Sequence, residues 1–231
     1  MNEDLEDLAR EIISCKKCPR LVSYIKEVAK KKRKMYQDWE YWGKPVPGYG
    51  DPNACLLIIG LAPGAHGANR TGRMFTGDSS GNWLMRALHE TGYANNPYSI
   101  SKDDGLTLRN VYITAPVRCA PPKNLPTRAE IQNCLPYLVR ELKILKNIKV
   151  ILALGRIAFN STLQALRYTF GLRFKPKPKF KHHAEYFLEQ VGIWLYASYH
   201  PSRQNTQTKR LTWDMWISIF RIIRDICKTI T

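Results

Sequence analysis

Residues suited to chemistry gather first in a glycine-rich segment, residues 60–78, with the sequence GLAPGAHGANRTGRMFTGD. It contains two arginines, an aromatic side chain at Phe75 and a carboxylate at Asp78. Its glycines would let the backbone approach a ligand closely or adopt positive φ angles. A segment that only connects two elements is usually shorter and chemically less varied. We therefore expect a ligand-binding loop here rather than a long surface turn.

Two other polar segments follow apolar runs in the same way. One extends from Arg118 to Asn124 and the other from His200 to Asn205. The carboxyl ends of parallel strands meet at one edge of a sheet, where ligands bind in open α/β folds. The three segments, far apart in the chain, are thus expected to line one cleft.

The elements that must position these segments alternate between strand and helix. Short apolar runs predict strands at residues 55–60, 110–115, 150–154 and 193–199. Helical spacing predicts helices at residues 3–14, 19–33, 80–91, 128–146, 156–168 and 211–227. Thr127 with Glu130 three residues later is a capping-box signature, and the Pro/Lys segment 173–183 is expected to be an exposed loop or crossover. This alternation predicts a mostly parallel sheet between layers of helices.

Composition bounds the cellular setting and the partners. The chain has 231 residues, enough for one α/β domain with a core of its own. An acidic N-terminus and the absence of a run of 18 apolar residues argue against a signal peptide and a membrane span, so a cytoplasmic protein is expected. The net charge of +17 includes the basic blocks 30–34 and 173–181, the second interleaved with aromatics and prolines. Lysine-rich surfaces also occur in heat-adapted proteins, but this pattern favours nucleic acid over a membrane as the partner.

Six cysteines fall into three groups. They are a C-x2-C pair at Cys15 and Cys18, a wide pair at Cys119 and Cys134, and two isolated residues, Cys55 and Cys227. The isolated two are expected to be ordinary buried cysteines, and disulfides are not expected among the other four in a cytosolic chain. A four-sulfur metal centre would suit those four, and spacing alone leaves zinc and an iron–sulfur cluster nearly even. An unrelated role for the wide pair is the remaining alternative.

Three features together resemble one enzyme family. The loop at residues 60–78, the segment HPSRQNTQTKRLT at residues 200–212 and the four-cysteine pattern look like a family 5 (B-type) uracil-DNA glycosylase of thermophilic bacteria and archaea. The resemblance covers essentially the whole chain. It implies the uracil-DNA glycosylase fold, a three-layer α/β/α sandwich with a central four-stranded parallel sheet. It also implies a structural [4Fe–4S] cluster on Cys15, Cys18, Cys119 and Cys134.

The implied activity is monofunctional hydrolysis of the bond between a damaged base and deoxyribose in DNA, as in base excision repair. The enzyme would flip the base out of the stack and leave an abasic site. The resemblance implies an intercalation loop that fills the vacated gap, formed by Ser202, Arg203, Gln204 and Asn205. No Schiff-base lysine is identifiable by motif, which agrees with a monofunctional reaction. The expected partner is single- or double-stranded DNA, and a monomer is expected.

Individual pocket roles also follow from the resemblance. Phe75 matches an aromatic residue that stacks on the base, and Gly60 and Ala62 belong to the pocket motif. Asn124 is a candidate for a pocket or DNA contact, with a turn residue as the alternative. His200 matches the histidine that hydrogen-bonds the leaving base.

The sugar side of the reaction depends on a carboxylate. Related glycosylases have an acidic residue just after the first motif glycine, where this chain has Leu61 and Ala62. Asp78 is the remaining carboxylate of the loop and matches the residue proposed for the family. Capping of the following helix is its alternative role, because Asp is a favoured N-cap.

Base selectivity is expected to be broad. Ala115 stands where related cluster-containing enzymes have a uracil-reading asparagine. An apolar site rejects analogues weakly, so hypoxanthine or modified pyrimidines are expected substrates beside uracil. The rival functions are a non-catalytic, zinc-containing nucleic-acid-binding module, and a hydrolase with a carboxylate-held metal, for which acidic residues are few.

Overall fold

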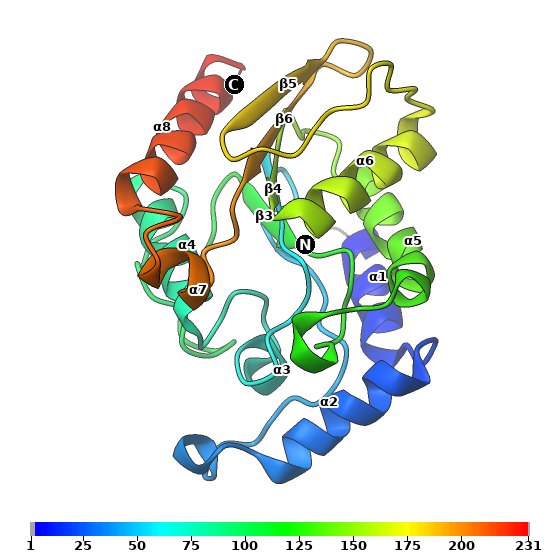
Figure 1. The fold of residues 1–231 in the computed structure, drawn as a ribbon, viewed down its shortest axis with the longest axis vertical. Helices are drawn as coiled ribbons and strands as arrows, with labels where there is room; N and C mark the ends of the chain where they lie inside the picture. Colours follow the sequence, from blue (N-terminus) through cyan, green and yellow to red (C-terminus); the bar gives the residue numbers. More distant parts are fainter. Residues whose placement is uncertain (1–2, 231) are drawn as a thin grey trace.

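A six-stranded sheet forms the centre of the computed structural model, which describes residues 3–230 (Figure 1). The strands are β1 (Tyr49–Gly50), β2 (Leu56–Ile59), β3 (Val111–Thr114), β4 (Val150–Leu154), β5 (Ala184–Leu188) and β6 (Ile193–Ser198). Their order is β1-β3-β2-β4-β6-β5; β3, β2, β4 and β6 are parallel, and β1 and β5 pair antiparallel at the edges. The predicted four-stranded parallel sheet is confirmed. The edge strands were missed because one has two residues and the other has a half-exposed alternating pattern.

Eight α-helices surround this sheet in the described part of the chain. They are α1 (Glu3–Ser14), α2 (Pro19–Lys31), α3 (Ala68–Thr71), α4 (Ser79–Glu90), α5 (Arg128–Ile144), α6 (Arg156–Phe170), α7 (Arg203–Gln207) and α8 (Trp213–Ile230), with 3-10 turns at Lys34–Tyr36 and Pro122–Asn124. The six predicted helices are all present, and the two missed helices, α3 and α7, are each a single turn or little more. No helix within residues 3–230 has the length and apolar character needed to cross a membrane.

The layers follow from the two faces of fully buried strands. Successive side chains of a strand point to opposite faces of the sheet. Leu56 and Ile58 of β2 pack in one apolar cluster with side chains of α4 and α8. Leu57 and Ile59 pack in the other with side chains of α5 and α6, and α1 packs against α5 on that side (Figure 1). The β2 run therefore has no polar alternation, as expected for a strand covered on both faces.

Local sequence signals fix the helix ends. The capping box before α5 is confirmed, because the backbone N–H of Glu130 donates to Thr127 Oγ1 at 3.2 Å and the backbone N–H of Thr127 donates to Glu130 Oε2 at 2.7 Å. Most of the segment 173–183, which leads from α6 to β5, is exposed as predicted.

The expectation for the two isolated cysteines was wrong. Cys55, just before β2, and Cys227, in α8, form a disulfide with their Cα atoms 6.0 Å apart. Both are buried, as expected, but the packing of α8 across the start of β2 brings the two sulfurs together. A sequence separation of 172 residues gives no local signal of such a pair.

Candidate functional site

A cavity of about 820 Å³ opens at the carboxyl ends of the parallel strands. Its walls come from the segments after β2, β3, β4 and β6, so the expected convergence of distant segments takes place. Of the expected site residues, the cavity is lined by Ala62, Phe75, Asp78, Ala115, Asn124, His200, Ser202, Arg203 and Gln204. Gly60 and Asn205 do not line the cavity; Gly60 lies against Phe75 and Asn205 against His200.

The Phe75 ring lies on Gly60 at one wall of the cavity. A Cβ atom at Gly60 would stand 2.7 Å from Phe75 Cε2, so only glycine lets the ring settle there. Phe75 itself has a φ of +50°, an uncommon conformation for a large side chain. Its ring stacks on the ring of His200, with centroids 5.8 Å apart and planes 28° from parallel. This pair gives the cavity a flat aromatic surface.

The position of Asp78 allows both of its expected roles, the helix cap and the catalytic carboxylate. Its Oδ1 accepts a hydrogen bond of 2.9 Å from the backbone N–H of Gly81, which makes it the N-cap of α4. Its Oδ2 lies against the backbone of the loop, where a Cβ at Gly67 would be only 2.2 Å away and one at Gly64 2.9 Å away. Burial raises the pKa of Asp78, opposed by backbone N–H groups and by the charges of Arg70 and Arg203. The carboxylate is therefore partly desolvated beside the cavity.

His200 follows β6 and is neutral at pH 7. Burial lowers the pKa of its imidazole to about 4. Its backbone carbonyl accepts a hydrogen bond of 2.8 Å from Asn205 Nδ2, which ties the start of the 200–205 segment to α7. A neutral imidazole retains one N–H donor and adds no positive charge to the cavity.

The predicted intercalation segment divides into exposed and structural residues. Ser202 is the N-cap of α7, with its Oγ accepting a hydrogen bond of 3.4 Å from the backbone N–H of Asn205. Arg203 and Gln204 are exposed at the cavity wall. The Asn205 side chain, committed to the His200 carbonyl, supports the segment from behind.

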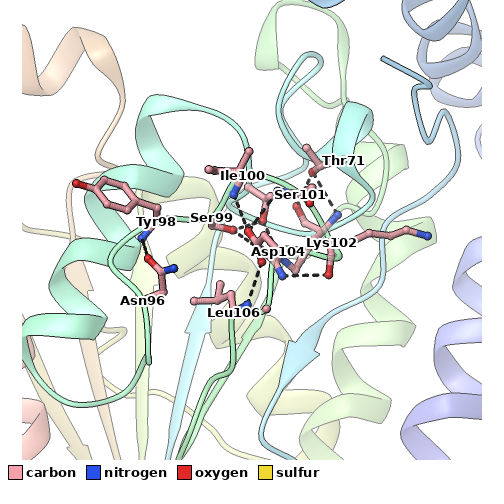
Figure 2. A network of polar contacts seen from close by, with 12 residues as sticks. Thr71, Asn96, Tyr98, Ser99, Ile100, Ser101, Lys102, Asp104 and Leu106 are labelled. Atoms are coloured by element: carbon pink, nitrogen blue, oxygen red, sulfur yellow. Dashed lines mark hydrogen bonds and ion pairs between the residues drawn. The ribbon is translucent and has the colours of Figure 1, made fainter. Parts of the chain in front are cut away.

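A buried polar network supports the loop that holds Phe75 and Asp78. Arg73 forms an ion pair with Asp104 at 2.7 Å, and its guanidinium also donates to Ser99 Oγ at 2.8 Å. Figure 2 shows how the loop at 95–106 turns around Asp104, whose carboxylate accepts backbone N–H bonds from Ile100, Ser101 and Leu106. The backbone N–H of Gly77 donates to the Ser99 carbonyl at 2.9 Å. The network thus anchors the loop at residues on both sides of Phe75.

The remaining cavity wall is largely apolar. Ala115, at the end of β3, is buried, and Leu61 and Ala62 line the same space. Asn124 has a φ of +57° and closes the 3-10 turn at Pro122–Asn124, where its side chain borders the cavity. No carboxylate stands on this wall among the described residues.

Four of the cavity residues that sequence reasoning did not single out carry an aromatic, imidazole or guanidinium group. They are Arg33, Tyr36, His66 and Arg156. Arg33 belongs to the basic block 30–34 and His66 to the glycine-rich loop, so their positions in these segments were an available signal. Arg156 lies just past the carboxyl end of the predicted strand 150–154, which was also a signal, whereas Tyr36 had none.

The four cysteines expected to bind a cluster are free and lie in neighbouring parts of the fold. Cys15 and Cys18 are in the turn between α1 and α2, Cys119 follows β3, and Cys134 is in α5. Cys18 packs in one small apolar cluster with Cys119, and Cys15 in another with Cys134. Among residues 3–230, no three His, Cys, Asp or Glu side chains are gathered tightly enough to hold a metal ion as they stand. The metal centre therefore stays a prediction.

Hydrogen-bond donors surround these thiols. The backbone N–H of Arg118 donates to Cys134 Sγ at 3.3 Å, and Asn133 Nδ2 donates to Cys18 Sγ at 3.7 Å. Burial raises the pKa of Cys134 to about 11, although the Arg118 charge opposes that shift. The buried Nε and Nη1 atoms of Arg118 have no hydrogen-bond partner among the described residues. The charge of Arg118 is paired with the buried Glu141 carboxylate at 2.5 Å, so what it offers an anionic thiolate centre is these two unused donors.

Comparison with known proteins gives the chain's relatives. The family model described as the uracil DNA glycosylase superfamily matches residues 47–221. The type-5 uracil-DNA glycosylase of Thermus thermophilus is 50% identical over 216 residues, which cover 94% of this chain and 95% of that protein. The type-5 enzyme of Pyrobaculum aerophilum is 45% identical, over 94% of this chain and 90% of its own length. The type-4 uracil-DNA glycosylase of Archaeoglobus fulgidus is 32% identical, over 87% and 82%. Because both the family model and these relatives extend over the cavity-forming segments, the chain belongs to the uracil-DNA glycosylase superfamily.

Proposed function

We propose that this protein is a monofunctional uracil-DNA glycosylase of base excision repair. The observation that carries the proposal is the cavity in which a stacked Phe75–His200 pair faces the same space as the Asp78 carboxylate. The names of the relatives, type-5 uracil-DNA glycosylases at 45% to 50% identity, support uracil as the substrate base. They do not favour a non-catalytic zinc-containing module.

The chemistry requires opposite charges to be stabilised at two places. When the N1–C1′ bond breaks, both bonding electrons leave with the base, so the base becomes an anion and the sugar an oxocarbenium-like cation. A neutral imidazole N–H of His200 would donate to a carbonyl oxygen of the base, where negative charge develops. The oxygen of water then bonds to C1′, and this water loses one of its two protons. The base anion takes up one proton. The products are free uracil and an abasic site.

Asp78 is proposed to act at the sugar. A carboxylate beside C1′ would stabilise the cation and orient the attacking water. Its raised pKa makes the ionised carboxylate a better proton acceptor than an ordinary surface aspartate. Capping and catalysis are compatible, because Oδ1 holds the helix and Oδ2 stays on the other side of the group.

A broad base range is proposed from the apolar wall. Ala115, Leu61 and Ala62 offer no side-chain hydrogen bond that would select the Watson–Crick edge of one base. Phe75 would stack on any planar base. Hypoxanthine should accordingly be released beside uracil, at a single-turnover rate within about 100-fold of that for uracil.

DNA would bind across the basic surface around the cavity mouth. Arg33, Arg156 and Arg203 line that mouth, and Ser202, Arg203 and Gln204 are proposed to fill the gap left by the flipped nucleotide. Phosphate contacts release counterions, so affinity for DNA should fall steeply with salt. The protein is proposed to act as a monomer on single- or double-stranded DNA.

A [4Fe–4S] cluster is proposed as a structural group held by Cys15, Cys18, Cys119 and Cys134. The donor set fits it, because the thiols adjoin a buried guanidinium and N–H donors that would stabilise thiolate sulfur. The cluster would link the turn between α1 and α2 to the start of α5. Measurement of iron and acid-labile sulfide against zinc in the purified protein tests it. One equivalent of zinc without iron would rule the cluster out.

The function is tested by base release from matched oligonucleotides. Duplexes carrying uracil, hypoxanthine or only normal bases are incubated with the wild type, His200→Ala and Asp78→Ala. We expect uracil and hypoxanthine release by the wild type, with no strand cleavage before alkali, and strong loss in both variants. An inactive wild type on uracil would overturn the proposed function, and confinement to uracil would overturn only the broad range.

A further inference from the structure

His66, in the loop between β2 and α3, lines the same cavity as Asp78 and His200, the proposed catalytic residues. It is half-buried, and its Nδ1 lies 3.0 Å from the hydroxyl of the buried Tyr41. The two rings meet edge to face, with centroids 6.0 Å apart. One ring nitrogen is therefore engaged inside the protein and the other, Nε2, has no hydrogen-bond partner among the described residues.

A third group contacts the Tyr41–His66 hydrogen bond, whose direction depends on the tautomer of His66. The backbone N–H of Arg33 donates to the Tyr41 hydroxyl oxygen at 3.4 Å. That contact uses the hydroxyl as an acceptor and leaves its hydrogen available to donate to His66 Nδ1, the arrangement adopted in the proposal below. Burial, followed by the charges of Arg33 and Arg70, lowers the pKa of His66, so the ring is neutral at pH 7. A neutral ring that accepts at Nδ1 carries its hydrogen at Nε2.

The surroundings of this N–H are positively charged. Arg33 is exposed at the cavity wall and follows three lysines of the block 30–34. Arg70 is buried behind the wall, with its guanidinium carbon 3.9 Å from the centre of the Tyr36 ring and 4.0 Å from that of Trp39. Its Nη2 also donates to the Gly77 carbonyl at 2.9 Å, next to Asp78. An N–H donor on a ring that feels the charges of both arginines favours an anion over a neutral acceptor.

We propose that Arg33 and His66 form a subsite for one DNA phosphate at the flipped nucleotide, with His66 donating from Nε2. Tyr41 is a positioning residue that holds the His66 ring and sets its tautomer. The inference rests on the proposed glycosylase function, because the phosphate would belong to a nucleotide extruded into this cavity. The subsite would hold the sugar near Asp78 by fixing the phosphate attached to it.

The test removes the charge of one phosphate at a time. Each duplex contains an uncleavable 2′-fluorinated deoxyuridine and one neutral methylphosphonate. The position of the methylphosphonate differs between duplexes and covers two nucleotides on either side of the deoxyuridine. Binding is measured for the wild type, His66→Ala, His66→Gln and Tyr41→Phe. The exposed His89→Ala, in the last turn of α4, is the matched control. We expect one methylphosphonate position to weaken wild-type binding by roughly tenfold or more, the size of a hydrogen bond to a charged group.

At that position the effects should not add. His66→Ala should bind the unmodified duplex about tenfold more weakly, and the methylphosphonate should then cost it little more. His66→Gln, which retains an N–H donor, should recover part of the affinity, and Tyr41→Phe should lose part of it. Fully additive effects at every position, with a wild type that still releases uracil, would overturn the subsite alone. A wild type that neither binds nor releases uracil would overturn the glycosylase function with it.

Discussion

Asp78→Asn separates the two roles of Asp78, because asparagine can cap a helix but cannot act as a carboxylate. In the wild type, Oδ1 accepts the Gly81 N–H at 2.9 Å, and an asparagine Oδ1 can take the same place. Asn and Asp are comparable N-caps, so the free energy of unfolding should change by less than about 0.5 kcal/mol. The lost interaction of a charge with the helix N-terminus is offset by relief of the desolvation that raises the pKa of Asp78. Asp78→Ala removes the cap and should cost about 1 kcal/mol.

The loss of activity, unlike the loss of stability, should be the same in the two variants. Both variants lack the carboxylate, so single-turnover release of uracil should fall by roughly 10²- to 10⁴-fold in each. In the proposed mechanism the ionised form of Asp78 is the active one, so wild-type release should decline as the pH falls through the raised pKa. This acid limb should therefore lie above the ordinary aspartate value of about 4. Asp78→Asn should show no such limb.

The assay pairs rapid-quench release of uracil with urea unfolding of the same three proteins. Equal losses of rate in Asp78→Asn and Asp78→Ala, beside unequal losses of stability, would support the carboxylate role. An Asp78→Asn protein that releases uracil at the wild-type rate would refute it and leave Asp78 as a helix cap. The His200 assignment would be untouched by that result.

Three other changes follow from the same structure. Gly67→Ala places a Cβ 2.2 Å from Asp78 Oδ2, so the carboxylate must move, and we expect about 100-fold slower release in a protein whose unfolding free energy falls by no more than about 2 kcal/mol. Asp104→Ala leaves its buried arginine partner unpaired and should lower the unfolding free energy by about 3 kcal/mol, which urea titration would detect; an unchanged midpoint would contradict the network. Cys227→Ser opens the link to Cys55, which closes a loop of 172 residues, and should cost about 5 kcal/mol under oxidising conditions; reductant should destabilise the wild type but not the variant.

The parallel sheet and its helices were predictable because each has a strong local signal. Val150–Leu154 is a short apolar run between polar residues, and Thr127 with Glu130 marks the start of α5, so both boundaries agree with the sequence. β1 was not predicted because a strand of two residues is too short to show an alternating hydrophobic pattern. The disulfide and the Arg73–Asp104 pair join residues distant in the chain, and only the packed fold reveals such contacts.

The sequence predicted which segments meet at the cavity but not how their side chains are arranged. Phe75, Asp78 and His200 were found from motifs and strand ends, whereas their mutual geometry depends on glycines whose purpose sequence does not state. Gly60 makes room for the Phe75 ring and Gly67 for the Asp78 carboxylate. The side chain of Asn205 points inward and donates to the His200 carbonyl, a contact that exists only in the folded loop and has no signal in the sequence.

The charge layout explains how a protein with a net charge of +17 could stabilise a cationic sugar. Positive charge attracts the DNA backbone, but an imidazolium in the cavity would also repel the oxocarbenium ion that forms at C1′. Burial lowers the pKa of His200 to about 4, so the cavity retains a hydrogen-bond donor for the departing base without that charge. Asp78 would then supply negative charge on the sugar side, while the exposed Arg33 and Arg203 stand at the rim, where phosphates would balance them. The separation of a basic rim from a neutral donor and a carboxylate is what the proposed reaction requires, and non-catalytic binding of DNA would require only the rim.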